Sequence, residues 1–508
     1  MDLAYKLGAL HVFIDKLNKE GYMSYIRLHK DAFFRQYADI GYLWQQKERR
    51  SLVLDTNGAL FFSALTREPQ QTEDICKRLM QGYTDVTKEQ ITADFMAFMG
   101  RFVPLNIVVM GSSIQEMNAN EQLFSYAKAE QYIRSTKTSV KSVNTSEENV
   151  NHFLTQHFKE HPQLLSLQIE ITPHCNLKCV HCYLGFGTPS HSAQTGLSTQ
   201  QICRVLDEFR ALGGLQVTFT GGEAMLNKDL PKLLRYARRK DLDIWVLTNA
   251  ALLNDELLKT MQETNVAGVQ VSLYSMVPED HDRITQVQGS FENTKKSIER
   301  LMEANIPVQL ACPVMKENFL SFETVLKWGH EHHLEVKLNS GIMARTDFTT
   351  DNLNHRINLE AQSVFIQKTL ASSPVYQERL LNNPELAVSA EEPVCGAGRY
   401  MLCLEAEGDY YPCPGFKLKL GNCKENSLKE IWEDSAELNK LRALTNAAYR
   451  ECLNCPSRAY CNLCPGKLYN ESGGDMFKLS DYFCEVAHIN RRIAEEFVAA
   501  HSKKKSTV

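Results

Sequence analysis

A regular alternation of strand-like and helix-like hydrophobic patterns marks the middle of this 508-residue chain, from about residue 165 to 345. Runs of apolar and alternating residues predict six strands, at Leu165 to Thr172, Leu215 to Thr220, Ile244 to Asn249, Val269 to Tyr274, Val308 to Val314 and Glu335 to Asn339. Apolar residues at helical spacing predict helices near 198–211, 229–240, 255–263, 291–304 and 321–332. The pattern predicts an α/β fold: a partial (β/α)6 barrel whose ligands bind at the C-terminal ends of the strands.

A different pattern precedes the barrel. Two short strands are predicted at Gly41 to Gln46 and Ser51 to Asp55, and helices follow at Asn57 to Leu65, Thr72 to Met80 and Thr87 to Phe102. Thr72 and Thr87 stand where helix N-caps belong. A hairpin with three helices predicts a small winged-helix domain.

The boundaries follow from changes in composition. Residues 110–149 are rich in Ser, Asn, Thr and Lys, which predicts a linker with one helix near Asn120 to Arg134. We divide the chain into a winged-helix domain (1–109), a linker (110–160), the barrel (161–350), a helical bridge (351–394), a cysteine-rich domain (395–490) and a C-terminal helix with a basic tail (491–508).

Charge narrows the classes of partner. The net charge is -5 with both signs interspersed, so we expect neither nucleic acid nor a membrane as partner. The apolar run Leu7 to Ile14 is broken at Asp15 and Lys16 and lacks the flanks of a signal peptide. We therefore expect a cytoplasmic protein.

Cysteine usage points to metal chemistry. The chain has fifteen cysteines, nine of them between residues 395 and 484. Because a reducing compartment disfavours disulfides, clustered cysteines there indicate metal binding or catalysis. Cys76, Cys203 and Cys312 stand apart from the clusters, and we interpret them as buried small hydrophobic residues.

Three cysteines follow the first barrel strand at a characteristic spacing, Cys175-x3-Cys179-x2-Cys182. A 4Fe-4S cluster normally takes four cysteine sulfurs, so a set of three leaves one iron for a non-protein ligand. The alternative is a structural zinc site in which His181 supplies the fourth ligand.

The spacing, followed by the aromatic Tyr183, resembles the radical S-adenosylmethionine (SAM) superfamily. The resemblance implies that the open iron binds SAM and that an electron from the cluster cleaves it to a 5'-deoxyadenosyl radical. Gly221-Gly222-Glu223, directly after the second strand, matches the family's GGE motif, which implies that these residues hold the SAM amino group.

Further SAM contacts are implied by the same resemblance. Ser272 of Val271-Ser272-Leu-Tyr274 would meet the ribose, Asn249 of Thr248-Asn249 would line the site, and Arg345 would meet the SAM carboxylate. A capping or turn role is the alternative for each. No catalytic acid, base or nucleophile is identified by the motifs.

The C-terminal cysteines resemble the SPASM extension, which binds two auxiliary 4Fe-4S clusters. The pattern is Cys395, Gly408-x4-Cys413, Cys452-x2-Cys455-x5-Cys461-x2-Cys464 and Cys484, with one x2 gap where x3 is commoner. Zinc ribbons are the alternative. The resemblance implies a first auxiliary cluster on Cys395, Cys413 and Cys464, with Cys403 or Cys423 as a fourth ligand or an open site. The second would use Cys452, Cys455, Cys461 and Cys484. Three 4Fe-4S clusters and SAM are thus the expected cofactors.

The segment Leu54-Asp-Thr-Asn-Gly58-Ala-Leu-Phe-Phe, with the Thr72 helix and the helix that contains Asp94, resembles the PqqD-like peptide-chaperone domain of pyrroloquinoline quinone biosynthesis. The resemblance implies that an extended leader peptide adds a strand to the hairpin edge. An accessory winged-helix domain without a ligand is the alternative.

Together these features resemble the radical SAM maturases of ribosomally made peptides, such as sactipeptide and ranthipeptide thioether synthases. We hypothesise a peptide-crosslinking maturase whose partners are a precursor peptide with its leader and an electron donor such as flavodoxin or ferredoxin. One alternative is an anaerobic sulfatase-maturating enzyme, a family with an aspartate where this chain has Pro414. Another is a non-catalytic, cluster-bearing peptide-binding protein. The intact motifs that begin at Cys175 and Gly221 argue against this alternative.

Overall fold

The computed structural model divides the chain into two compact units, Met1–Gln163 and Leu164–Val508. It describes residues 24–38, 40–82, 86–125, 157–158, 161–184, 196–382 and 388–505. The Ser/Thr-rich part of the predicted linker, residues 135–146, and the end of the predicted helix near Arg134 lie outside the described residues.

The described residues of the first unit form two small sheets and four helices. Its strands are β1 (Tyr25–Leu28), β2 (Ala32–Tyr37), β3 (Ile40–Gln45), β4 (Arg50–Leu54), β5 (Gln70–Gln71) and β6 (Val108–Gly111). Its helices are α2 (Thr56–Ser63), α3 (Thr72–Met80), α4 (Lys88–Gly100) and α5 (Ile114–Ser125). The predicted hairpin is β3 with β4, and the three predicted helices are α2, α3 and α4. The sequence patterns did not predict β1, β2 and β6.

Strand pairing explains why part of the polar segment is ordered. β6 pairs along its whole length with β1, which also pairs with β5, and α5 packs on β6. Residues 110–125, which their composition placed in a linker, therefore belong to this unit. Local capping sets the helices: Thr87 forms a capping box with Gln90, as predicted, whereas Gln71 takes the N-cap position of α3 that we expected of Thr72.

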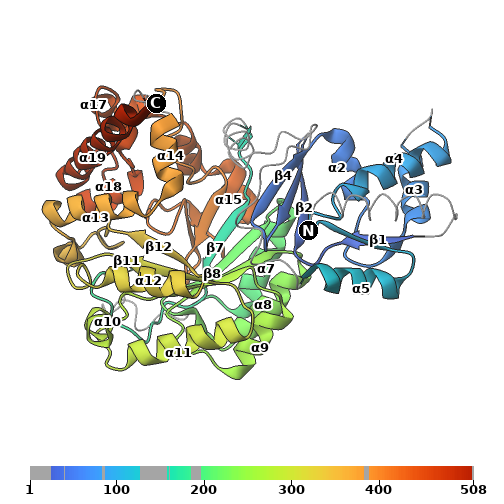
Figure 1. Ribbon diagram of the computed structural model, residues 1–508, viewed down its shortest axis with the longest axis horizontal. Helices are drawn as coiled ribbons and strands as arrows, with labels where there is room; N and C mark the ends of the chain where they lie inside the picture. Colours follow the sequence, from blue (N-terminus) through green and yellow to red (C-terminus); the bar gives the residue numbers. More distant parts are fainter. Residues whose placement is uncertain are drawn as a thin grey trace. The chain divides into compact units, whose positions relative to one another are not determined.

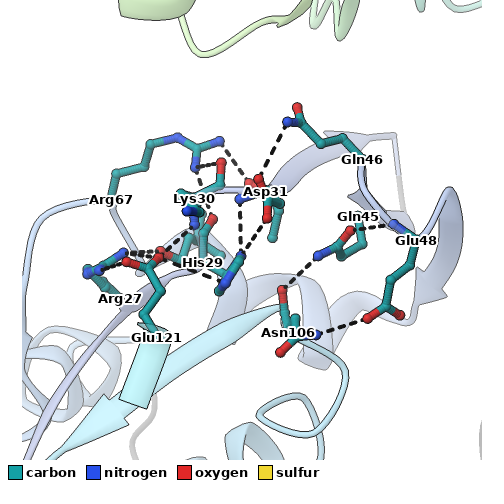
Figure 2. Close-up of polar contacts among 12 residues, drawn as sticks. Arg27, His29, Lys30, Asp31, Gln45, Gln46, Glu48, Arg67, Asn106 and Glu121 are labelled. Atoms are coloured by element: carbon teal, nitrogen blue, oxygen red, sulfur yellow. Dashed lines mark hydrogen bonds and ion pairs between the residues drawn. The ribbon is translucent and has the colours of Figure 1, made fainter. Parts of the chain in front are cut away.

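A buried polar network joins the β1–β2 loop to α5 and to the loop after α2 (Figure 2). Arg27 forms a bidentate ion pair with Glu121, at 2.8 and 3.1 Å. His29 is 4% exposed, and its Nδ1 accepts a hydrogen bond from the Asp31 backbone at 3.1 Å. Arg67 donates to the carbonyls of residues 29, 30 and 32. The network satisfies the backbone of a sharp, buried turn.

The second unit is built on one nine-stranded sheet with the order β12-β11-β10-β9-β8-β7-β13-β14-β15. Its strands are β7 (Ser166–Glu170), β8 (Gln216–Thr220), β9 (Asp243–Thr248), β10 (Gly268–Ser272), β11 (Val308–Pro313), β12 (Glu335–Asn339), β13 (Met401–Leu404), β14 (Asp409–Tyr411) and β15 (Gly421–Asn422). β7 to β12 are parallel and match the six predicted strands to within two residues at each end. The predicted partial barrel is confirmed.

Helices follow the barrel strands in turn and cover the outer face of the sheet (Figure 1). They are α7 (Thr199–Ala211), α8 (Leu230–Arg239), α9 (Asp255–Glu263), α10 (Pro278–Thr285), α11 (Ser290–Glu303) and α12 (Phe322–Glu331). The sequence did not predict α10, because its residues are mostly polar. Fully buried Leu, Ile, Val and Phe side chains fill the space between sheet and helices, among them Leu167, Phe209, Phe219, Val246 and Leu310.

The cysteine-rich segment continues the barrel sheet. β13 pairs in parallel with β7, in the register Leu402 opposite Leu167, and then leads into an antiparallel hairpin with β14. The remaining helices are α13 (Leu359–Ala371), α14 (Pro374–Asn382), α15 (Leu428–Asp434), α16 (Ala436–Arg442), α17 (Arg450–Leu453), α18 (Pro465–Ser472) and α19 (Asp481–Lys505). α19 begins ten residues before the predicted C-terminal helix and packs on α13 and α14. Among the helices of the described residues, none combines the length and the hydropathy of a bilayer span.

The buried imidazole of His29 makes the first unit sensitive to acid. Burial lowers the pKa of His29, and Asp31 and Glu121 offset only part of this effect. Between the folded pKa and the unfolded value of about 6.5, the unfolded chain binds more protons, so His29 loses its contribution to stability as the pH falls below about 6.5. We expect the melting-temperature advantage of the wild type over His29→Gln to shrink between pH 7.5 and 5.5. A difference that is independent of pH would contradict this prediction.

Candidate functional site

The three cysteines of the first motif lie in an irregular loop at the C-terminal end of β7. Backbone hydrogen bonds at 3.0 Å tie Lys178 N to Thr285 O and Val180 N to Ile284 O, so the end of α10 holds one side of the loop. A further bond joins Cys182 N to Cys179 O at 3.1 Å. Because its amides are paired, this loop of irregular structure follows a fixed path.

The thiols of Cys175, Cys179 and Cys182 lie close enough to influence one another electrostatically. Burial raises the pKa of Cys175 to about 11 and that of Cys179 to about 12. Thiolates in such surroundings need a positive partner, and soft thiolate sets suit iron-sulfur clusters. Within the described residues, no three His, Cys, Asp or Glu side chains converge tightly enough to hold a single metal ion. The ligand set of a cluster, with each thiolate on a different iron, therefore stays a prediction from the spacing.

The Gly221-Gly222 turn after β8 packs directly against this cysteine loop. Gly221 has a φ of 141°, and a Cβ there would lie 2.4 Å from the Thr172 carbonyl oxygen. At Gly222 a Cβ would lie 2.2 Å from the carbonyl oxygen of His174. The Gly222 amide donates to Thr172 O at 3.0 Å, and the next amide to His174 O at 2.8 Å. Only glycine permits this approach of two backbones.

Glu223 fastens the same turn to the end of β9. Its carboxylate is 1% exposed and accepts hydrogen bonds from Met225 N at 2.9 Å, from Asn249 N at 2.8 Å and from the Thr248 hydroxyl. Burial raises the pKa of Glu223 despite these bonds. A carboxylate offers about four acceptor positions, so one remains for a ligand.

The other predicted SAM contacts gather around the cysteine loop and have partners of their own. The Asn249 amide donates to Asn176 Oδ1 at 2.9 Å. Arg345 donates from Nε to the Cys182 carbonyl at 3.2 Å and from a terminal nitrogen to Asp351 at 2.8 Å. Their roles toward SAM stay predictions.

Two side chains at the strand ends were missed by the sequence reasoning. Tyr274, two residues beyond β10, places its hydroxyl 3.7 Å from Cys179 Sγ, and Ser272 hydrogen-bonds that hydroxyl. Glu170, the last residue of β7, is 4% exposed and its Oε1 has no hydrogen-bond partner among the described residues. Burial raises the pKa of Glu170 to about 7. An acidic residue inside an apolar strand pattern was the signal for Glu170.

Tyr183 links the first cysteine group to the C-terminal one. Its hydroxyl lies near Glu170, Cys182, Cys403 and Cys413, and burial raises its pKa well above the usual value. Its backbone carbonyl accepts a hydrogen bond from Thr346 at 2.8 Å. Tyr183 was predicted to contact SAM, and its position between two sets of thiols follows from the pairing of β13 with β7.

The C-terminal cysteines form two groups. Cys395, Cys413 and Cys464 are electrostatic neighbours, and burial raises the pKa of Cys413 to about 12. Cys403, buried in β13, lies near Cys413 and Glu170, whereas the charged neighbours of Cys423 are Arg204, Lys424 and Glu208. Of the two candidates for a fourth ligand, this placement favours Cys403.

The second group unites four thiols at the base of α19. Cys484 of α19 lies near Cys452 and Cys455, and Cys461 lies near all three. Burial raises the pKa of Cys461 to about 11. A small cavity lined by Cys452, Cys461, Cys464, Cys484 and Lys467 lies beside this group.

Comparisons with known proteins match both cysteine-bearing regions. Residues 169–329 match the radical SAM superfamily, and residues 395–456 match SPASM, an iron-sulfur cluster-binding domain. Such domains indicate 4Fe-4S clusters and SAM binding, which replaces the zinc alternatives.

Relatives and solved structures extend the match. The chain is 26% identical to an AdoMet-dependent heme synthase of Methanosarcina barkeri, over 60% of this chain and 92% of that protein. It is 28% identical to the antilisterial bacteriocin subtilosin biosynthesis protein AlbA of Bacillus subtilis, over 60% of this chain and 68% of that protein. The fold is similar to that of Streptococcus suis SuiB bound to the precursor peptide SuiA, with a TM-score of 0.58 and 16% identity, over 90% of this chain and 99% of that one.

The close approach at Gly222 can be tested by adding one methyl group. We expect Gly222→Ala to lower the free energy of unfolding of the second unit by about 2 kcal/mol, because the Cβ overlaps a backbone atom that cannot move aside. Urea denaturation followed by fluorescence measures the change. Gly196→Ala, in the same unit, is the matched control, since a Cβ there meets its nearest atom at an ordinary 3.4 Å. Equal stability of the two variants would show that the turn tolerates a side chain.

Proposed function

Since the chain belongs to the radical SAM enzymes and carries a SPASM iron-sulfur domain, we propose that it installs crosslinks, thioether or carbon-carbon, in a ribosomally made precursor peptide. The observation that carries the proposal is the extent of the fold similarity. The similarity to SuiB covers 90% of the chain and so reaches into the first unit. The match to AlbA supports the same class of substrate.

In this proposal Cys175, Cys179 and Cys182 hold the radical-generating cluster, and Glu223 and Asn249 line the SAM site beside it. When bound, the cluster and SAM together supply a 5'-deoxyadenosyl radical that takes a hydrogen atom from a peptide carbon. The Gly221-Gly222 turn would hold the cysteine loop beside this site, because the absence of side chains lets the two backbones meet.

The SPASM cysteines would handle the surplus electron. Joining a carbon radical to a thiol releases one proton and one electron, so an electron acceptor must lie near the barrel. We assign Cys395, Cys413, Cys464 and Cys403 to one auxiliary cluster and Cys452, Cys455, Cys461 and Cys484 to another, which makes three clusters in the chain. A flavodoxin or ferredoxin would supply the electron that starts the reaction.

The first unit would present the peptide. β3 is the central strand of its three-stranded sheet, so β2 and β4 form the edges within the described residues. An extended leader can add to such an edge through backbone hydrogen bonds.

Pro414, at the position where sulfatase-maturating enzymes carry an aspartate, disfavours the alternative of a sulfatase-maturating enzyme.

Activity on a peptide provides the direct test. Anaerobically reconstituted, reduced protein should cleave SAM to 5'-deoxyadenosine and should lower the mass of a precursor peptide by two hydrogens per crosslink. Mass spectrometry measures both products. Absence of SAM cleavage would refute the proposed enzymatic activity. If SAM is cleaved and a porphyrin is turned over while candidate peptides stay unchanged, the proposed peptide substrate is refuted.

Iron content tests the number of clusters. We expect about twelve irons per chain in the reconstituted wild type and about eight in Cys452→Ala, because each 4Fe-4S cluster holds four irons. Cys203→Ala is the matched control: this half-buried cysteine lies in α7, outside both groups, and its removal should leave about twelve. Iron content near four in the wild type would eliminate the auxiliary clusters.

A further inference from the structure

We propose that Tyr274 sets the reduction potential of the radical-generating cluster by donating a hydrogen bond from its hydroxyl to the Cys179 thiolate. Tyr274 is then a positioning residue that acts on the cluster through one of its ligands. The inference rests on the proposed cluster at Cys175, Cys179 and Cys182 and adds a residue that the SAM-binding motifs do not include.

The direction of the hydrogen bond follows from the chemistry of the two groups. Tyr274 Oη lies 3.7 Å from Cys179 Sγ, within reach for the large sulfur atom. A cysteine that binds iron is a thiolate, so it can only accept. A tyrosine hydroxyl is protonated at neutral pH, because its ordinary pKa is about 10, so it can donate.

Ser272 directs the donor. Ser272 is the last residue of β10, and Tyr274 lies two residues beyond it. The Ser272 side chain hydrogen-bonds the Tyr274 hydroxyl. Because the phenol has a single proton and this proton goes to sulfur, serine is the donor of the second bond. With one lone pair occupied, the tyrosine proton is free to point at sulfur. The side chain expected to meet the SAM ribose is thus engaged with Tyr274.

The rest of the surroundings hold Tyr274 in place. Its backbone amide donates to His281 Nδ1 at 3.3 Å, and its carbonyl accepts from Asn318 Nδ2 at 2.7 Å. The ring centroid lies 4.9 Å from that of His181 and 5.2 Å from that of His281. Tyr274 is 5% exposed, so its hydroxyl cannot exchange Cys179 for bulk water.

The physical consequence is a shift in the reduction equilibrium. Reduction adds one negative charge to the cluster, and a hydrogen bond to a ligand sulfur stabilises the more negative state. Low polarity around the bond strengthens this effect. Removing the hydroxyl should therefore lower the ratio of reduced to oxidised cluster at a fixed potential about tenfold, which corresponds to about 59 mV for a one-electron couple.

The test compares Tyr274→Phe with the wild type in redox titrations of the full reconstituted chain. Electron paramagnetic resonance follows the radical-generating cluster, whose signal is recognised by its change when SAM is added. We expect a more negative midpoint potential in Tyr274→Phe and an unchanged one in the control Tyr236→Phe, whose hydroxyl bonds Asp207 on the outer helices. Iron content is measured in parallel.

Each outcome has a distinct meaning. An unchanged potential in Tyr274→Phe with full iron content overturns the inference and leaves the proposed function intact. A wild type without a SAM-sensitive cluster overturns the proposed function itself. If Tyr274→Phe does not fold, replacement of Tyr274 by 3-fluorotyrosine closely keeps the side chain's shape and makes the hydroxyl a stronger donor that is still mostly protonated at neutral pH. The potential should then become more positive, and a constant value again overturns the inference.

Discussion

The close contact between two backbone segments at the strand ends governs the rest of the site. The turn at Gly221 and Gly222 lies against the carbonyls of Thr172 and His174, at distances that no side chain would allow. Glu223 then anchors the turn to β9. The cysteine loop is thus fixed by β8 and β9 on one side and by the end of α10 on the other. A loop without regular structure gains its rigidity from these neighbours rather than from its own sequence.

Desolvation of sulfur is the second constraint. The thiols of the barrel loop and those of the C-terminal segment lie in surroundings that disfavour the thiolate. A cluster that binds the thiolate form reverses this penalty, so part of the binding free energy acts as folding free energy. Assembly of the clusters and consolidation of the surrounding structure are therefore thermodynamically coupled.

Sequence patterns predicted the barrel well because each strand and helix there has a strong local period. The same is true of the hairpin and three helices of the first unit. Pairing between distant segments was not predictable in this way. The residues of β6 (Val108–Gly111) do not indicate β1 as their partner, and those of β13 (Met401–Leu404) do not indicate β7. In the site, cysteine spacing predicted the groups of ligands. Tyr274 and Glu170 were missed because their roles depend on which sulfur or strand lies opposite, a fact of tertiary structure.

The pairing of β13 with β7 has a consequence for how the chain can be divided. When a (β/α) barrel is incompletely closed, its first strand can form an open edge, and an open edge favours pairing with another chain. Here the cysteine-rich segment covers that edge, with Leu402 and Leu404 beside Leu167 and Ile169. A chain that ended before Met401 would bare β7 and the apolar residues beside it. We therefore expect the barrel to be soluble only together with the cysteine-rich segment, although the two look like separate modules in the sequence.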